Sequence, residues 1–383
     1  MPRLRAELAS RSYDVLVARG ALSGLGAALG ELRVPGKTVV CSDENVAPLY
    51  LDAACASLRA AGSTVSQIVI PAGESEKNLG RAAEVYGVLY DRGVRRGDVL
   101  VALGGGVIGD LTGYVAATYL RGVGLVQAPS TLLAQVDAAV GGKVAVDFRA
   151  GKNYVGTFYQ PLLVVADPET LRTLPPRELR SGAAEIVKYG FLAGGTLLDD
   201  VEALAEATRA GSDGPVSSAG GTPAGAGTDG PAGALSEDLI AACVAEKLAV
   251  VSRDEREESG ERAVLNLGHT VGHAIEAATG FRRYSHGEAV GLGLRATLWL
   301  SERLCGFSGT EVERGLGLLD AIGMPMRVHG TTPDDVRELI GRDKKAGADG
   351  VEFVLLEGFG RPRLRALVPA SLLEEVVTWL SAP

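Results

Sequence analysis

Residues 99–110, VLVALGGGVIGD, indicate the fold of this chain. The first five residues are an apolar run typical of a buried strand. Gly104, Gly106 and Gly109 follow it in a GxGxxG pattern at the start of a predicted helix. Such glycines let backbone N–H groups approach a pyrophosphate at a helix N-terminus, but they also serve tight packing of a helix on a sheet. The pattern departs from the usual dinucleotide fingerprint, because it follows a late strand and the next acid after Asp110 is Asp137.

The sequence around this loop alternates between strand and helix patterns. In chain order these are strand 37–42, helix Asn45–Ala61, strand 63–70, helix Asn78–Arg92 and strands 123–129 and 161–167. Alternation of this kind is typical of a doubly wound domain with a parallel sheet. From Pro175 onward the periodicity is mainly helical, with a strand pair near residues 351–368. The sequence therefore predicts an α/β domain over residues 1–176 and a mostly α-helical domain over residues 177–383.

Residues 209–235 differ from the rest of the helical part. They are rich in glycine, alanine, serine and proline and contain almost no apolar side chain to bury. This composition is typical of flexible segments. We expect a flexible insertion on the surface of the helical domain.

The composition argues against several classes of protein. The formal net charge is −9, which disfavours broad contact with nucleic acid or an anionic membrane. No apolar run approaches the roughly 20 residues of a spanning helix, and the N-terminal residues carry charges where a signal peptide has an apolar core. The four cysteines are scattered without a CxxC pattern, which predicts buried thiols. We therefore predict a cytoplasmic protein.

Polar residues follow the two strands before the glycine loop. Asp43 and Asn45 come after strand 37–42, and Glu74 and Lys77 come after strand 63–70. Ligands of open α/β sheets bind at the carboxyl ends of the strands. Each segment alone also fits a simple helix cap. Three such loops on one edge favour a bound dinucleotide.

Two lysines directly follow glycines, at Gly142-Lys143 and Gly151-Lys152. Exposed glycine backbone beside a point cation is typical of loops that approach a phosphate. Lysine is scarce here, since only eight of the 38 basic residues are lysines. The alternative is a pair of surface lysines in turns. Asp137, nearby in sequence, also fits an ordinary surface acid.

Three of the four histidines lie between residues 269 and 286. His269 and His273 are one helical turn apart and share a face, and His286 adds a third imidazole. Catalytic zinc sites use three protein ligands and keep a position open. Glu185 is a candidate carboxylate ligand, because it lies in an apolar helical stretch, three residues before Lys188. Spacing does not say which three groups bind an ion; core or surface histidines and a surface Glu185–Lys188 ion pair are the alternatives.

Together these motifs resemble one known family, the 3-dehydroquinate synthases, which are sugar-phosphate cyclases. The resemblance spans residues 42–345 and lies in the segments SDENVAPLY, GESEKN, GGGVIGDLTGYVAATYLRG, STLLAQVDAAVGGKVAVD, GKNYVGTFYQP, LPPRELRSGAAEIVKYG, RAVLNLGHTVGHAIE, YSHGEAVGLGL and RDKK. It implies a nucleotide-binding α/β domain joined to a helical domain.

The resemblance also implies the site residues. NAD+ would contact Asp43, Asn45, Glu74, Lys77, Gly105, Gly106, Val107, Gly109, Asp110, Ser130, Thr131, Lys143, Lys152, Thr170, Leu171 and Thr173. A divalent metal, Zn2+ or Co2+, would be held by Glu185, His269 and His286. The substrate would be bound by Asp137, Lys143, Asn153, Lys188, Lys247, Arg262, Asn266 and Lys344. His273 would act as an acid–base group, and Arg121 would reach the neighbouring subunit's site in a homodimer.

The implied activity converts 3-deoxy-D-arabino-heptulosonate 7-phosphate to 3-dehydroquinate and phosphate in the shikimate pathway. Its steps are NAD-dependent oxidation, phosphate elimination, re-reduction and intramolecular aldol cyclisation. The substrate is a small anion, whose carboxylate and phosphate the implied lysines and arginines would bind.

Three alternatives stay open. They are another sugar-phosphate cyclase, such as the amino-dehydroquinate synthase type, a metal-dependent polyol dehydrogenase, and a non-catalytic NAD- and metal-binding protein. The chain departs from the family pattern at Ser130 in place of threonine, Ala138-Ala139 in place of a serine pair and Asp147 in place of asparagine. None of these departures removes an implied ligand.

Overall fold

The computed structural model describes residues 2–32, 36–149, 151–212, 235–342, 346–347 and 350–382. The chain divides into two compact units. Unit 1 comprises Met1–Leu174 with Lys247–Arg256, and unit 2 comprises Pro175–Glu246 with Glu257–Pro383. The sequence predicted a boundary after residue 176, with residues 247–256 in the helical domain.

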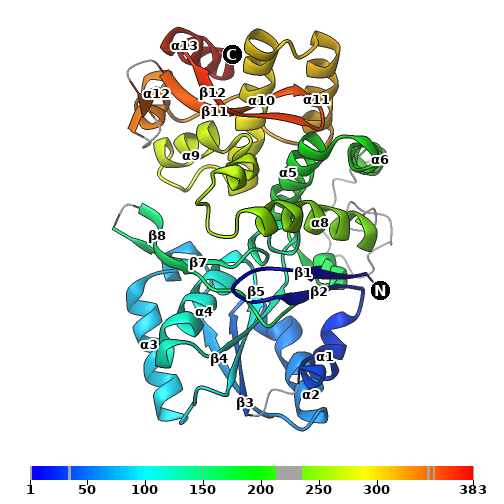
Figure 1. Cartoon of the computed structure of the whole chain (residues 1–383), viewed down its shortest axis with the longest axis vertical. Coiled ribbons are helices and arrows are strands. Elements are labelled where there is room, and N and C mark those ends of the chain that lie inside the picture. The colour runs from blue at the N-terminus through cyan, green and yellow to red at the C-terminus, as the bar shows by residue number, and fades with distance from the viewer. Residues whose placement is uncertain are drawn as a thin grey trace, which may run out of the picture. The chain divides into compact units, whose positions relative to one another are not determined.

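Unit 1 is built on a seven-stranded sheet with the order β1-β2-β9-β6-β5-β3-β4 (Figure 1). Adjacent strands are parallel, except that β1 and β2 are antiparallel at one edge. The strands are β1 (Arg3–Ala6), β2 (Tyr13–Val17), β3 (Lys37–Asp43), β4 (Thr64–Ile70), β5 (Val99–Gly104), β6 (Gly124–Pro129) and β9 (Leu163–Ala166). The predicted α/β fold class with a parallel sheet is confirmed.

Both faces of this sheet are buried under helices. The helices are α1 (Leu25–Glu31), α2 (Asp52–Ala60), α3 (Leu79–Asp91) and α4 (Gly106–Thr118). Side chains alternate between the faces of a strand, so Val39 of β3 packs in an apolar cluster with α3 and α4, and Val40 packs in another with α1 and α2. On β5, Leu100 and Val101 divide in the same way. Because both faces of the sheet are covered, its central strands are apolar at successive positions, as in other sheets that are buried on both faces.

A hairpin of β7 (Lys143–Phe148) and β8 (Gly151–Phe158) forms a separate two-stranded sheet, which was not predicted from the sequence. The Asp147 N–H donates to the Lys77 carbonyl oxygen at 2.8 Å, so the hairpin is anchored beside the loop after β4. The short helical turns of unit 1 are η1 (Ala21–Gly24), η2 (Ala47–Leu51), η3 (Glu74–Glu76), η4 (Tyr119–Arg121), η5 (Ala134–Ala138) and η6 (Pro168–Thr173).

Unit 2 is mostly helical, as the fold class predicted. Its helices are α5 (Pro176–Ala193), α6 (Gly195–Ser212), α9 (His269–Ala278), α10 (His286–Cys305), α11 (Gly309–Ala321), α12 (Pro333–Arg342), α13 (Ala370–Ser381) and the short η7 (Glu261–Asn266). Helix α8 (Glu237–Arg253) begins in unit 2, and its residues from Lys247 belong to unit 1. An antiparallel sheet of β10 (Ala346–Gly347), β11 (Gly350–Gly358) and β12 (Arg361–Val368) contains the predicted strand pair. Residues 213–234 of the predicted insertion lie outside the described residues.

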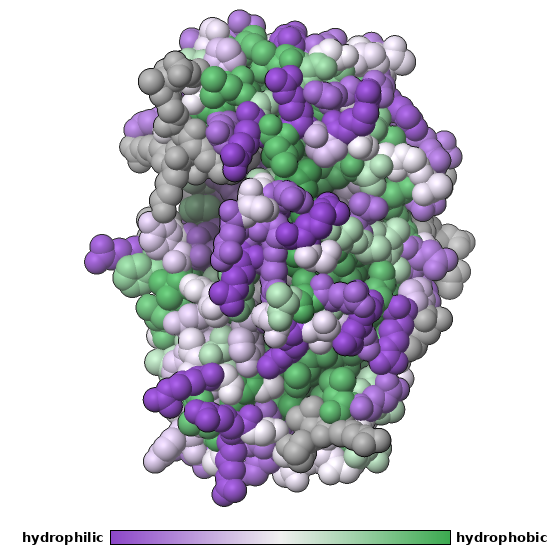
Figure 2. Space-filling model, viewed as in Figure 1, coloured by the Kyte–Doolittle hydropathy of each residue, from purple (hydrophilic) through white to green (hydrophobic). Residues whose placement is uncertain are grey.

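Within the described part of the chain, every helix is too short or too polar to span a bilayer. On the face of the molecule in Figure 2, hydrophilic residues are interspersed with smaller hydrophobic areas. Scattered apolar surface of this kind is normal for globular proteins.

Helix α10 is buried along most of its length and packs closely against two other helices. A Cβ atom at Gly293 would lie 1.8 Å from the Gly268 carbonyl oxygen, which directly precedes α9. A Cβ atom at Gly287 would lie 2.0 Å from the Ser181 carbonyl oxygen of α5. Glycine at these two positions lets three backbones approach one another more closely than a side chain would permit. The first turns of α9 and α10 and the middle of α5 are thereby brought together.

We expect Gly293→Ala to destabilise the protein by at least about 2 kcal/mol, because its methyl group would overlap a backbone oxygen that cannot rotate away. The matched control is Gly317→Ala on α11, where the nearest heavy atom to the added carbon is 4.0 Å away. This control should change stability by no more than about 1 kcal/mol, in the stabilising direction, since alanine favours helix. The midpoint of chemical denaturation measures both. Equal midpoints for the two variants would contradict the close packing of α9 on α10.

Candidate functional site

The predicted NAD contacts follow five parallel strands of unit 1 at their carboxyl ends. Asp43 ends β3 and Asn45 follows it, Glu74 and Lys77 follow β4, Gly105 to Asp110 follow β5, Ser130 and Thr131 follow β6, and Thr170, Leu171 and Thr173 follow β9. The carboxyl ends of parallel strands lie at the same edge of a sheet, so the structure gathers these segments there. Lys143 and Lys152 lie on the β7–β8 hairpin.

The glycines of this loop differ in how closely the fold packs around them. A Cβ atom at Gly104 would lie 2.7 Å from Ile108, and one at Gly109 would lie 3.0 Å from the Gln127 side chain. Gly104 is therefore needed for packing, and Gly109 leaves little room for a side chain. At Gly106 the nearest atom would be 3.8 Å away, and Gly105 caps α4 without a side chain. The first N–H groups of α4, at Gly106 and Val107, thus suit a pyrophosphate.

A buried lysine joins the β4 loop to α4 and the hairpin. The Lys77 Nζ lies 3.1 Å from Glu74 Oε1, 3.1 Å from Asp110 Oδ2 and 2.7 Å from Asn153 Oδ1. Burial alone would lower the pKa of Lys77, but the Asp110 and Glu74 carboxylates outweigh it and raise the pKa. Burial raises the pKa of Asp110 to about 6, against the opposing effect of Lys77. Lys152 lies at the margin of this network, with its Nζ 3.9 Å from Glu74 Oε1.

The remaining predicted NAD contacts are held by a second network at the same edge. The Thr170 hydroxyl donates to the Asp167 carbonyl oxygen at 2.8 Å, and the Tyr50 hydroxyl lies 2.6 Å from Thr173 Oγ1. The Ser130 Oγ is buried and has no hydrogen-bond partner among the described residues. A buried hydroxyl of this kind is suited to a ligand group. The donors and the open helix end of this edge therefore fit a dinucleotide.

Two predicted substrate contacts of unit 1 bind each other. The Lys247 Nζ donates to the Asp137 carbonyl oxygen at 2.6 Å and lies 3.0 Å from Asp137 Oδ1. Asp137 is therefore not the ordinary surface acid of the alternative interpretation. Arg121 is exposed and has a positive φ of 63°, an uncommon conformation for a residue other than glycine.

The three predicted metal ligands converge within unit 2. Glu185 is fully buried in the middle of α5, while His269 and His286 are the first residues of α9 and α10. The Glu185 Oε1 lies 3.6 Å from His269 Nε2 and 3.5 Å from His286 Nε2. The three ligand atoms lie within 4.8 Å of one another. One carboxylate and two imidazoles in this arrangement suit Zn2+ or a similar divalent ion.

A contact at Nδ1, the ring nitrogen that faces away from Glu185, sets the orientation of each imidazole. The His269 Nδ1–H donates to the Leu267 carbonyl oxygen at 3.1 Å, which leaves the Nε2 lone pair facing Glu185. The His286 Nδ1 lies 3.4 Å from Glu276 Oε2. Burial lowers the pKa of His269 to about 3. Burial would also lower the pKa of His286, but the Glu185 and Glu276 carboxylates raise it to about 10.

Helix starts fix these two histidines in place. Gly268 has a left-handed conformation with φ of 79° directly before His269. Ser285 caps α10 through a reciprocal capping box with Glu288, directly before His286. The backbone on each side of the cluster is thus held by its local sequence.

The alternative of a surface Glu185–Lys188 ion pair is wrong. The two side chains do form an ion pair, but both are buried. The ring centroid of His273 lies 5.3 Å from that of His269, and His273 itself is exposed. Arg262 is buried on η7, with its Nε 4.0 Å from Glu257 Oε1.

Asn266 lines a cavity of about 250 Å³ in unit 2, together with Thr270 and Arg365. Lys344 lies outside the described residues, so its predicted contact has no structural description. Glu276 beside His286 was not singled out from the sequence. The sequence feature that could have indicated Glu276 is its place three positions after His273 in a mostly apolar helical stretch.

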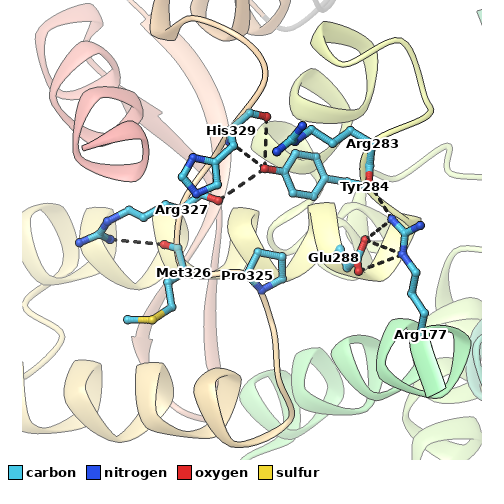
Figure 3. Close-up of a pocket in the computed structure, with 8 residues that line it drawn as sticks. All are labelled: Arg177, Arg283, Tyr284, Glu288, Pro325, Met326, Arg327 and His329. Atoms are coloured by element: carbon cyan, nitrogen blue, oxygen red, sulfur yellow. Dashed lines mark hydrogen bonds and ion pairs between the residues drawn. The ribbon is translucent and has the colours of Figure 1, made fainter. Parts of the chain in front are cut away.

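A larger cavity of about 560 Å³ lies elsewhere in unit 2 and contains none of the predicted site residues. Figure 3 shows that Arg177 and Glu288 face each other across one side of it. The Arg177 Nη2 lies 2.7 Å from Glu288 Oε2 and donates to the Arg283 carbonyl oxygen at 2.7 Å. Since Glu288 belongs to the capping box before His286, this cavity wall supports the start of α10.

Family models and a relative of known name agree on one family for this chain. A family model described as 3-dehydroquinate synthase N-terminal matches residues 67–181, and one described as 3-dehydroquinate synthase C-terminal matches residues 182–346. The chain is 40% identical over 374 residues to the 3-dehydroquinate synthase of Citrifermentans bemidjiense, covering 98% of both chains.

Two solved structures are also similar. A 2-deoxy-scyllo-inosose synthase, complexed with carbaglucose-6-phosphate, NAD+ and Co2+, is 25% identical with a TM-score of 0.82, covering 98% of this chain and 99% of that one. The 2-epi-5-epi-valiolone synthase of Streptomyces hygroscopicus, with NAD+ and Zn2+ bound, is 26% identical with a TM-score of 0.82, covering 98% of both.

We expect Glu185→Gln to weaken zinc binding, because it removes the charged oxygen on which both imidazoles converge. Loss of a residue that only hydrogen-bonds to a metal ligand weakens binding by about 10–100-fold, and loss of a ligand itself should weaken it more. Competition with a chromogenic chelator measures the affinity, and circular dichroism checks folding. The matched control is Glu178→Gln, an exposed acid on the same helix, which should bind zinc as the wild type does. Wild-type affinity in Glu185→Gln would refute the assignment of this ligand.

Proposed function

This chain belongs to the 3-dehydroquinate synthase family, and on that premise we propose that it converts 3-deoxy-D-arabino-heptulosonate 7-phosphate to 3-dehydroquinate and phosphate. The reaction is a phosphate elimination coupled to ring closure, using NAD+ and one divalent metal ion. It would serve the shikimate pathway, which leads to aromatic amino acids.

The observation that carries the proposal is the cluster of the buried Glu185 and His269 with the half-buried His286, beside Lys188 and His273. It combines a set of metal ligands, a buried cation and an exposed imidazole within one unit. A protein that only bound a metal would not need the cation and the additional imidazole next to the ligands.

The residues of this chain suit both cofactors that the two similar cyclase structures contain. Glu185, His269 and His286 would hold the metal, and the first turn of α4 with Ser130 and the Lys77 network would hold NAD+. When bound, the metal would supply Lewis-acid polarisation of a substrate hydroxyl, and NAD+ would supply reversible hydride exchange.

The cations of the chain would bind the two anionic groups of the substrate. Lys188, Lys247 and Arg262 are almost fully buried, and each lies next to a carboxylate: Glu185, Asp137 and Glu257, respectively. These partners hold the cations in fixed positions before the substrate arrives. Fixed charges in a buried site stabilise developing negative charge without having to reorganise. Lys143, Asn153, Asn266 and Lys344 would complete the substrate contacts.

His273 would move the protons of the reaction. Its ring is exposed, and it lies one helical turn from His269 on the same face of α9. An imidazole can accept a proton in one step and return it in another. His273 is not part of the group formed by Glu185, His269 and His286, but it lies close to His286 in a second group with Glu276.

The expected result of a direct assay is phosphate release without net NADH. The purified protein is given the heptulosonate phosphate, catalytic NAD+ and Zn2+ or Co2+, while phosphate and the NADH absorbance band are followed together. Lasting NADH formation would indicate a polyol dehydrogenase instead. Turnover of an amino analogue of the substrate, but not of the substrate itself, would indicate the amino-dehydroquinate synthase type.

We also propose that the protein works as a homodimer in the cytoplasm, with Arg121 entering the neighbouring subunit's site. Support comes from the exposed position of Arg121, directly after Leu120, an apolar side chain with an exposed fraction of 44%. The cytoplasmic location rests on the four free cysteines, since thiols are kept reduced in that compartment.

A subunit-mixing experiment tests the role of Arg121. Arg121→Ala and Glu185→Gln should each be inactive, because one lacks the arginine and the other a metal ligand. If Arg121 acts on the partner's site, random mixed dimers contain one intact site, so about a quarter of wild-type activity should return. The control is each variant taken alone through the same unfolding and refolding. No recovery in the mixture would show that Arg121 does not act across an interface.

A further inference from the structure

Glu276 is a buried carboxylate on α9 that the proposed reaction does not yet use. Only 3% of its surface is exposed. Positions 269, 273 and 276 share one face of the helix, since they differ by about one or two turns. Val271, Ala274 and Ile275 of the same helix pack into the apolar core. A carboxylate in such surroundings is costly unless it is bound to polar partners.

The ring of His286 lies between two carboxylates. Its Nε2 lies 3.5 Å from Glu185 Oε1, and its Nδ1 lies 3.4 Å from Glu276 Oε2. A carboxylate accepts, so the Nδ1 carries a proton toward Glu276, and the Nε2 is the ring nitrogen that faces Glu185 and is placed to bind an ion. His269 reaches the same orientation through the backbone carbonyl of Leu267. The two histidines thus have different supports, one neutral and one charged.

Glu276 also reaches the predicted acid–base group. One ligand atom each of His273, Glu276 and His286 lies within 4.8 Å of the other two. The same carboxylate is therefore close to a histidine that would hold the metal and to a histidine that would move protons.

We propose that Glu276 is the positioning residue of this site, holding His286 in the orientation and tautomer that bind a metal through Nε2, and keeping His273 beside it. This inference rests on the proposed function for the role of His273, but its effect on the metal is independent of any reaction. A carboxylate behind a metal-binding imidazole fixes the ring and makes the nitrogen facing the ion more basic.

Zinc affinity without substrate tests the proposal. Glu276→Gln should weaken zinc binding about 10–100-fold, because the neutral amide is a weaker acceptor and can turn its NH2 group toward Nδ1. Glu276→Asp keeps the charge but withdraws it by one methylene group, so its affinity should lie between those of Glu276→Gln and the wild type. The control is Glu302→Gln on α10, whose acid pairs with Arg303 at the surface and should leave affinity unchanged.

Two further measurements separate the possible outcomes. The visible spectrum of the Co2+-loaded protein should shift in Glu276→Gln, since the imidazole loses its fixed orientation. The stoichiometry should be one ion per chain in the wild type and in both variants. Unchanged affinity and spectrum in a folded Glu276→Gln would overturn the proposal.

Two ions in the wild type, with one lost in Glu276→Gln, would also overturn it, because His273, Glu276 and His286 would then be ligands of a second ion. The proposed function can fail separately. If Glu276→Gln binds zinc more weakly but the wild type releases no phosphate, the positioning role of Glu276 stands and the proposed reaction is rejected.

Discussion

The burial of the Glu185 carboxylate is the constraint on which unit 2 depends. A charged oxygen in the apolar middle of a helix is costly unless opposite charge and hydrogen bonds surround it. Lys188 supplies a cation from the next turn of α5, and His269 and His286 approach from two other helices. Removing one member leaves another buried charge without compensation, so stability and the metal site are set by the same few side chains.

Backbone packing brings those side chains together. Gly287 of α10 lets the backbone of α5 approach α10, and Gly293 of α10 does the same for the start of α9. A Cβ atom at either glycine would overlap the approaching backbone. The capping box at Ser285 and the left-handed Gly268 then set where each histidine begins its helix. The chemistry of the site therefore rests on residues that carry no functional group at all.

The sequence predicted the parallel sheet and the helical second part, because apolar periodicity reports directly on burial. It also indicated the glycine loop and the scarce histidines. It did not predict the β7–β8 hairpin, the burial of Lys188 or the position of Glu276 behind His286. Each of these depends on contacts between residues far apart in the chain, and local patterns do not contain them. For the same reason the sequence left two roles open for Gly104 and Gly109, phosphate approach or tight packing. The residues that the fold places beside them indicate packing.

His269 and His286 are the first residues of their helices, and this has an electrostatic consequence. Side chains lean toward the N-terminus of a helix, so both imidazoles project beyond helix ends that each carry about half a positive charge. Together with the Lys188 cation, these partial charges offset the negative charge of the Glu185 and Glu276 carboxylates around the cluster. Part of the cost of burying the two carboxylates is thus met by backbone dipoles, which no side-chain substitution removes.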